Sequence, residues 1–423
     1  MQRMNQDSIR TVPLEGRLLF AAARKQIDPL TRESMEALLK ANPDWSVVSK
    51  LAEENKVLPL VYNTFSNHFL GTIPDGELEK FKEKVNQTVA WNEHTQSLLL
   101  DILRLFEKEK IPVAPFKGLV FTLLFYGSKK LRECGDIDIL VRRVDFLRAK
   151  DLLIRNGYDH VYFGNHEAAT VQAQFVRFDR SNSVDLHYGL TPHHLETDAN
   201  EIASGSRLGR EEWYGPDRRF TYWFFFLDTG PVWERMSTMS LDGMQVQVFS
   251  PEDQLLVAII NGVKEHWNKL SRVADLNELI RAQPELDWGY ILGNARALRC
   301  EKKLYFGLRL THEIYQTPLP ARLVPVITQI PALSLLSRQM IQQFSGQSHF
   351  FPNPRNHRFI QVLFTTDCNR DRARYLRYVL GKLTVPGETR ASLIEIIRFL
   401  RAVLNQLCMI VAMRLGLDLE LRI

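Results

Sequence analysis

Two aspartates, Asp136 and Asp138, stand one residue apart in GDIDILV, a stretch in which acidic and aliphatic residues alternate. Alternation with a period of two indicates a β-strand, so both carboxylates should project from one face while the aliphatic side chains turn toward the core. Carboxylates held side by side repel each other unless a cation lies between them. Such oxygen ligands suit Mg²⁺ or Mn²⁺, together with substrate phosphates and water. The pair therefore predicts a divalent-metal site for phosphate chemistry.

A lysine–glycine pair precedes the aspartates. Lys117 and Gly118 follow a short apolar run, 111–116, which suits a buried strand, and open a very apolar segment, 119–126, which suits a buried helix. Glycine lets the backbone approach a ligand closely, and a helix N-terminus offers free N–H groups and a favourable dipole to phosphates. We expect Lys117 and Gly118 to bind the phosphates of a nucleotide, with the lysine adding a positive charge.

Two further residues complete this hypothesis. Arg132 lies four residues before Asp136 and is expected to steady the phosphates or the carboxylates. Chemistry with two metal ions needs a third carboxylate to orient or deprotonate the acceptor hydroxyl. Asp185, in SVDLH on a predicted strand at 183–188, is the best candidate. His187 either helps to place the acceptor or is only a hydrogen-bonded partner within the sheet.

Each feature taken singly has an ordinary structural explanation. A D-x-D pair is common on a solvated edge strand, a Lys-Gly pair is common as a simple turn, and Asp185 alone would be a surface residue. The functional interpretation is favoured because the features follow one another as strand, Lys-Gly, buried helix, Arg, paired Asp and later Asp.

The surrounding pattern predicts an α+β fold. A small mixed β-sheet at 101–249 would form the catalytic core, flanked by helical regions at 1–100 and 250–423. Asp44 is a predicted N-cap, and residues 75–110 have the 3.6-residue period of a long helix.

Composition excludes several other classes of protein. With 45% hydrophobic and 24% charged residues, the 423-residue chain is neither disordered nor fibrous. Its net charge of +5 does not demand a nucleic-acid partner, because 12 Lys/Arg against 6 Asp/Glu at 355–423 account for the excess. Four scattered cysteines predict neither a zinc site nor a disulfide framework. No signal peptide or long apolar span is recognisable, so we expect a cytoplasmic protein without a membrane span.

These motifs together resemble a known family, the uncharacterised nucleotidyltransferases of bacterial type within the polymerase-β superfamily. The family pattern is K-G, an apolar helix ending in Tyr, an Arg, D-I-D-(L/I)-L-V, and later (I/V)-D-L-H. The matching positions are Lys117-Gly118, Tyr126, Arg132, 136–141 and 184–187. The resemblance covers most of the chain and is most specific between 117 and 188.

The resemblance implies metal-dependent transfer of a nucleoside monophosphate from an NTP, ATP by expectation, to a hydroxyl or phosphate acceptor, with release of pyrophosphate. The modest net charge and the absence of a known RNA-binding motif favour a small-molecule acceptor, with protein or tRNA as alternatives and no requirement for nucleic acid. The resemblance assigns Mg²⁺ or Mn²⁺ and catalysis to Asp136, Asp138 and Asp185, and nucleotide binding to Lys117, Gly118 and Arg132.

The chain departs from the wider superfamily at the phosphate turn. The usual Gly-Ser before the acidic pair is replaced by Lys117-Gly118, whereas the Gly127-Ser128 pair leaves little room for a helix before Asp136. We therefore prefer Lys117-Gly118 as the phosphate turn.

A non-catalytic protein that senses nucleotide, or a scaffold on the same fold, is the alternative function. The presence of all three carboxylates and the lysine argues for catalysis, because a site without catalytic demand could lose any of them.

Overall fold

The computed structural model describes residues 9, 11–161, 172–177, 182–190, 229–298, 300–347, 361–362, 364–367, 372, 404, 408 and 411. The basic region at 355–423 lies almost wholly outside these residues.

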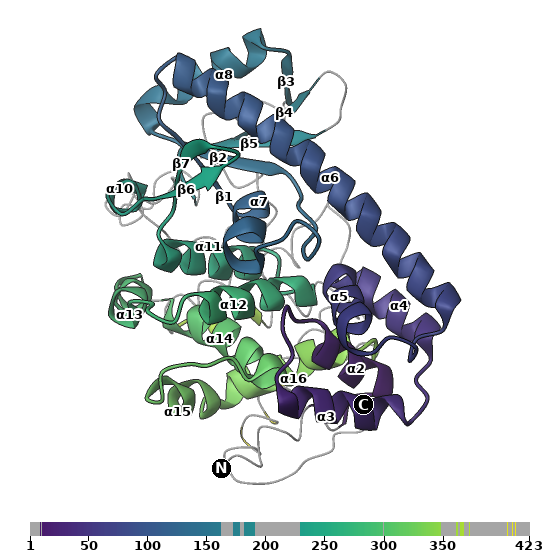
Figure 1. Cartoon of the computed structure of the whole chain (residues 1–423). Coiled ribbons are helices and arrows are strands. Elements are labelled where there is room, and N and C mark those ends of the chain that lie inside the picture. Colours follow the sequence, from purple (N-terminus) through teal and green to yellow (C-terminus); the bar gives the residue numbers. More distant parts are fainter. Residues whose placement is uncertain are drawn as a thin grey trace, which may run out of the picture.

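Helices form the N-terminal part of the chain. They are α2 (Leu14–Ala22), α3 (Pro29–Leu39), α4 (Trp45–Glu54), α5 (Leu58–His68) and α6 (Asp75–Lys108). The side chain of Asp44 accepts hydrogen bonds from the backbone N–H groups of Ser46 and Val47, which confirms the predicted cap of α4. Helix α6 has 34 residues and runs from the N-terminal helices to the sheet (Figure 1).

The central sheet has five strands: β1 (Val113–Phe116), β2 (Ile137–Val141), β3 (Tyr158–Val161), β4 (Gln172–Arg177) and β5 (Ser183–His187). Their spatial order is β1-β2-β5-β4-β3. The β2–β5 pair is parallel, whereas the other three pairs are antiparallel, so the sheet is mixed as predicted. Strands β6 (Ser237–Leu241) and β7 (Met244–Val248) form a separate two-stranded antiparallel sheet.

Short helices connect the strands of the central sheet. After β1 the chain forms α7 (Gly118–Phe121), which continues as the π-helical turn η1 (Thr122–Tyr126). After β2 come the 3₁₀ turn η2 (Arg143–Asp145) and α8 (Phe146–Arg155).

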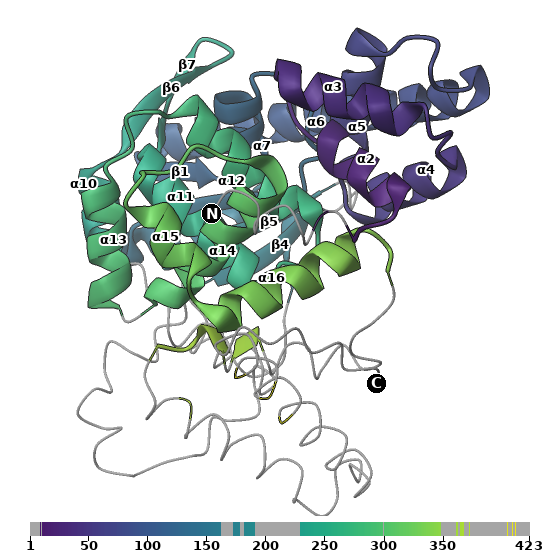
Figure 2. The same ribbon diagram turned by 90° about the horizontal axis from the view of Figure 1, so that it is seen from below.

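The C-terminal part of the described chain is helical. Its elements are α10 (Thr229–Glu234), α11 (Pro251–Lys264), α12 (Leu270–Ala282), α13 (Trp288–Ala297), α14 (Glu301–Tyr315), α15 (Leu323–Thr328) and α16 (Pro331–Phe344). Ser250 caps α11 through a hydrogen bond from the backbone N–H of Asp253, with proline at the first helical position. Seen from below, α11, α12, α14 and α16 lie in front of the sheet, and the N-terminal helices group to one side (Figure 2).

Two hydrophobic clusters cover the two faces of the sheet. One packs Ile137, Ile139 and Val141 of β2 against α6, α8 and the β6–β7 hairpin. The other joins α2 and α5 to Phe116 and Leu140 and to α11, α12, α14 and α16. The fold is therefore α+β, as the sequence predicts, and Asp138 of β2 lies on the face toward the C-terminal helices, on the same side as Leu140.

Within the part of the chain that the structure describes, no helix combines the length and the apolar character needed to cross a bilayer.

Candidate active site

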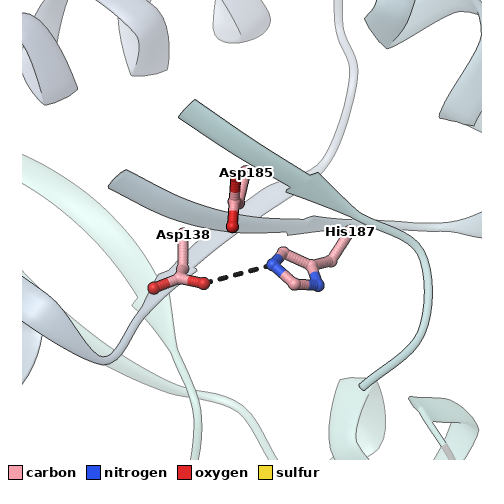
Figure 3. A group of neighbouring side chains, drawn as sticks. All are labelled: Asp138, Asp185 and His187. Atoms are coloured by element: carbon pink, nitrogen blue, oxygen red, sulfur yellow. Dashed lines mark hydrogen bonds and ion pairs between the residues drawn. The ribbon is translucent and has the colours of Figure 1, made fainter. Parts of the chain in front are cut away.

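The parallel pairing of β2 with β5 brings the acidic residues of the two strands together. Asp138 lies directly opposite Asp185, and Leu140 lies opposite His187. Since side chains two residues apart share a face, Asp138, Asp185 and His187 project on the same side of the sheet. Their side chains point toward a common space (Figure 3).

Asp138 is held by two positively polarised partners. Its Oδ1 lies 3.1 Å from Lys117 Nζ and 3.1 Å from His187 Nε2. Burial alone would raise the pKa of Asp138, but the Lys117 ammonium and the His187 hydrogen bond outweigh it and hold the pKa well below its usual range. Asp138 is therefore a carboxylate at any physiological pH.

Asp185 has the opposite environment. Its Oδ1 is buried and has no hydrogen-bond partner among the described residues. Burial, opposed by nearby His187 and reinforced by the charges of Asp138 and Asp136, raises the pKa of Asp185. A buried carboxylate oxygen without a donor is unfavourable unless something positive contacts it. This oxygen is the observation that best fits a bound cation.

The three side chains form a suitable donor set for a divalent ion. One ligand atom from each of Asp138, Asp185 and His187 lies within 4.8 Å of the others. Two carboxylates suit Mg²⁺ or Mn²⁺, and the imidazole nitrogen adds a ligand that Mn²⁺ accepts more readily than Mg²⁺.

Asp136 lies outside this group of donors. The strand begins at Ile137, so Asp136 belongs to the turn before it, and its side chain is exposed. Its Oδ1 accepts a short hydrogen bond from the Ser183 hydroxyl at the start of β5. The predicted role of Asp136 as a metal ligand stays a prediction.

Lys117 has an unfavourable backbone conformation. Its φ of 57° and ψ of −148° mirror an extended conformation and are largely confined to glycine. Such a conformation costs about 1–3 kcal/mol and persists where the surroundings impose it, often at functional sites. The ammonium thereby reaches Asp138 and lies 4.8 Å from the centroid of the Phe116 ring.

Gly118 is required by a close approach of two backbone segments. Its φ is +32°, and a Cβ built on it would lie 3.3 Å from the backbone oxygen of Asp136. The predicted phosphate turn is thus in contact with the chain just before the acidic strand. Gly127 ends η1 with a left-handed φ of 68°, and the Ser128 hydroxyl accepts a hydrogen bond from the backbone N–H of Lys130.

Arg132 contacts protein groups on three sides. Its Nε and Nη2 donate to the two carboxylate oxygens of Asp275 in α12, at 2.6 and 2.9 Å. Its Nη1 donates to the backbone oxygen of Gly118 at 3.0 Å. These contacts hold the guanidinium against the backbone of the Gly118 turn. The expected contact of Arg132 with nucleotide phosphates stays a prediction.

His187 is a site residue whose role the sequence left open. Its side chain is 5% exposed, and its ring meets the Phe116 ring edge-on, with centroids 5.1 Å apart. Phe116 in turn stacks on Phe249. The signal in the sequence was the spacing of two residues from Asp185, which puts both side chains on one face.

A comparison with protein families matches residues 41–316 to the model of one family, described as uncharacterised nucleotidyltransferases. No curated protein and no solved structure matches the chain. The family match contains the whole described site, from Lys117 through Asp138 and Asp185 to Asp275. On this evidence the chain belongs to the uncharacterised nucleotidyltransferase family.

Proposed function

We propose that this protein is a metal-dependent nucleotidyltransferase. It transfers a nucleoside monophosphate from an NTP, with ATP as the expected donor, to a hydroxyl or phosphate acceptor and releases pyrophosphate. The observation that carries the proposal is the three-donor group of Asp138, Asp185 and His187 beside the Lys117 ammonium, in a member of a nucleotidyltransferase family.

The cation would be held by Asp138 and Asp185, with His187 as a nitrogen donor. Asp136, in the turn just before β2, would add a further carboxylate. A bound Mg²⁺ or Mn²⁺ would neutralise charge on the phosphates during an in-line displacement. Lys117 is placed to exchange its contact with Asp138 for a phosphate oxygen, because its ammonium is already beside the donor group.

In the transfer step the acceptor oxygen forms a bond to the α-phosphorus, and the bond from that phosphorus to the bridging oxygen breaks. Pyrophosphate leaves with the electron pair. When the acceptor is a hydroxyl, Asp185 takes its proton.

A small molecule is the acceptor that best agrees with the modest net charge of +5. A tRNA acceptor would bind with a steep salt dependence, because phosphate contacts release counterions. Measurement of acceptor binding at two salt concentrations separates the two classes.

The decisive experiment incubates the protein with labelled NTPs, Mg²⁺ or Mn²⁺ and cell extract, and identifies the molecule that acquires the label. Asp138→Ala should abolish metal-dependent labelling and pyrophosphate release while the circular dichroism spectrum stays that of the parent. Labelling at the parental rate by this variant would refute the proposed chemistry.

A second measurement distinguishes an enzyme from a nucleotide-sensing scaffold. Divalent metal with NTP should raise the melting temperature by linkage in either case. Only the enzyme should release pyrophosphate once the acceptor is supplied.

A further inference from the structure

The phosphate turn and the C-terminal helices are connected through one arginine. We propose that Asp275 of α12 is a positioning residue, which holds the Lys117-Gly118 turn in its nucleotide-binding shape by orienting Arg132. This inference rests on the proposed function, because it concerns the same nucleotide site. It gives the C-terminal helical region a direct part in that site.

The Arg132–Asp275 pair has the geometry of a fixed support. Two nitrogens of the guanidinium donate to the two oxygens of the carboxylate, at 2.6 and 2.9 Å. The side chains are 18% and 10% exposed. Burial alone would lower the pKa of Arg132, but the Asp275 carboxylate outweighs it and raises the pKa. A bidentate pair fixes the plane of the guanidinium as well as its position.

The third nitrogen of the guanidinium supports the phosphate turn. Arg132 Nη1 donates to the backbone oxygen of Gly118 at 3.0 Å, and the Thr122 hydroxyl donates to the same oxygen at 3.1 Å. Two donors on one carbonyl fix the orientation of the peptide that follows Gly118. They act beside Lys117, whose positive φ is costly without such support.

Tyr126, at the end of η1, also contacts Asp275 but lies outside the connection from Asp275 through Arg132 to Gly118. Its hydroxyl donates to Asp275 Oδ1 at 2.9 Å and its side chain is fully buried. The Tyr126 hydroxyl contacts Asp275, whereas the donors to the Gly118 carbonyl described above are Arg132 and Thr122. Tyr126 therefore provides a matched control, since its hydroxyl can be removed while the Arg132–Asp275–Gly118 connection stays.

The proposal predicts that loss of the Asp275 charge weakens nucleotide binding but not metal binding. Asp275 acts on the turn that receives phosphates, whereas the Asp138–Asp185–His187 donor group is positioned by the pairing of β2 with β5. Loss of the Asp275 charge should misplace the turn and leave the donor group intact. Loss of one well-placed contact to a charged phosphate changes binding affinity by about 10- to 100-fold.

The test measures two equilibria on the full chain, below the melting temperature of every variant. Mn²⁺ affinity is measured by electron paramagnetic resonance, and ATP affinity is measured by calorimetry at saturating Mn²⁺. We expect Asp275→Asn to weaken ATP binding by about 10- to 100-fold with Mn²⁺ affinity unchanged. Asp275→Glu should restore much of the ATP affinity, and Tyr126→Phe should bind ATP as the parent does.

Several results would overturn the proposal. A purely structural role for Asp275 would lower the melting temperature of Asp275→Asn but leave its ATP affinity at the parental value. Equal weakening of ATP binding in Tyr126→Phe would show that general packing, and not the Arg132 connection, is responsible. Should Asp275→Asn fail to fold, Arg132→Lys tests the same connection, because a compact ammonium lacks the planar fork that reaches both oxygens of Asp275 and the Gly118 carbonyl at once. If the parent protein binds no ATP, the proposed function itself is refuted. If Asp275→Asn and Arg132→Lys both bind ATP with the parental affinity, this inference alone is refuted.

Discussion

At the scale of single residues, the two aspartates that face each other across β2 and β5 have opposite environments. Asp138 is stabilised as a carboxylate by Lys117 and His187, whereas Asp185 keeps a buried oxygen without a donor among the described residues. Neighbouring carboxylates whose pKa values are pushed apart are a common sign of a division of roles. Here the Asp138 carboxylate is already balanced by Lys117 and His187, whereas the Asp185 carboxylate would gain a counter-charge from a bound cation.

The first residue-scale prediction concerns Asp185→Asn in the metal-free protein. Because the pKa of Asp185 is raised in the folded state, its ionised form destabilises that state at neutral pH. Removal of the charge should raise the melting temperature at pH 7 by about 1–3 °C. The gain should shrink as the pH falls toward the usual carboxyl pKa of 3.8 and vanish below it, where Asp185 is protonated in both states.

Calorimetric scans in EDTA between pH 3 and pH 8 measure this difference. Asp101→Asn, at an exposed position of α6, serves as the control and should leave the melting temperature unchanged. A lower melting temperature for Asp185→Asn at pH 7 would show that the ionised carboxylate stabilises the fold.

The second residue-scale prediction separates the charge of Lys117 from its backbone conformation. Lys117→Gly and Lys117→Met both remove the ammonium and should both weaken ATP binding. The glycine variant should be the more stable of the two by about 1 kcal/mol, because glycine adopts a φ of 57° without strain but loses more entropy on folding. Urea unfolding of the two variants gives the comparison directly, and a glycine variant less stable than the methionine variant would mean that Lys117 is unstrained.

At the scale of elements, local sequence patterns predicted most strands of the sheet but not β3 and not the pairing of β2 with β5. The alternation around 136–141 and in SVDLH predicted β2 and β5, and both strands form, although β2 begins one residue later than expected. Strand β3 was missed, because YDHV is short and has no clear alternation. The pairing of Asp138 with Asp185 could not be predicted, because it depends on a parallel contact between strands with β3 and β4 between them in the chain.

The contacts of Arg132 show the same limit. The sequence placed Arg132 close to the acidic strand, which is correct, but its carboxylate partner lies 143 residues later in α12. Local periodicity contains no information about such a partner. The π-helical turn that carries Tyr126 toward Asp275 was likewise predicted only as part of a buried helix.

An element-scale prediction concerns how closely α14 packs beside α11. A Cβ on Gly307 of α14 would lie 2.6 Å from both Ile259 and Trp267, and Trp267 is fully buried. Gly307→Ala should therefore destabilise the protein by about 1–3 kcal/mol. Gly293→Ala on α13 meets no atom within 4 Å and should stabilise by up to about 1 kcal/mol. Denaturant midpoints measure both, and a neutral Gly307→Ala would indicate looser packing than described.

At the scale of the whole molecule, the sheet shares its hydrophobic core with both helical regions. The cluster that contains Phe116 and Leu140 extends to N-terminal helices and to α11, α12, α14 and α16. The predicted boundary at residue 100 falls within α6, whose Leu98 and Phe106 pack in the other cluster. The division into three regions at residues 100 and 250 stays a prediction.

The whole-molecule prediction is that residues 101–249 alone do not fold stably. The excised fragment would expose Phe116, Leu140 and the apolar face now covered by α6, and burial of such side chains contributes about 1.5–3 kcal/mol each. Rapid proteolysis of the fragment and the absence of a cooperative melting transition are the expected results. A protease-resistant fragment with a sharp transition would show that the sheet is an autonomous domain.

The separation of Arg132 and Asp275 in the sequence also determines when each is made during synthesis on the ribosome. A ribosome adds about 5–20 residues per second, so the 143 residues that separate them take roughly 7–30 seconds to synthesise. Lys117 is made before that interval and Asp138 and Asp185 are made in its first half, whereas the carboxylate that balances Arg132 is made at its end. The nascent chain therefore contains the residues of the proposed chemistry before Asp275 can position the nucleotide-binding turn. We expect nucleotide binding to begin only after α12 has emerged from the ribosome.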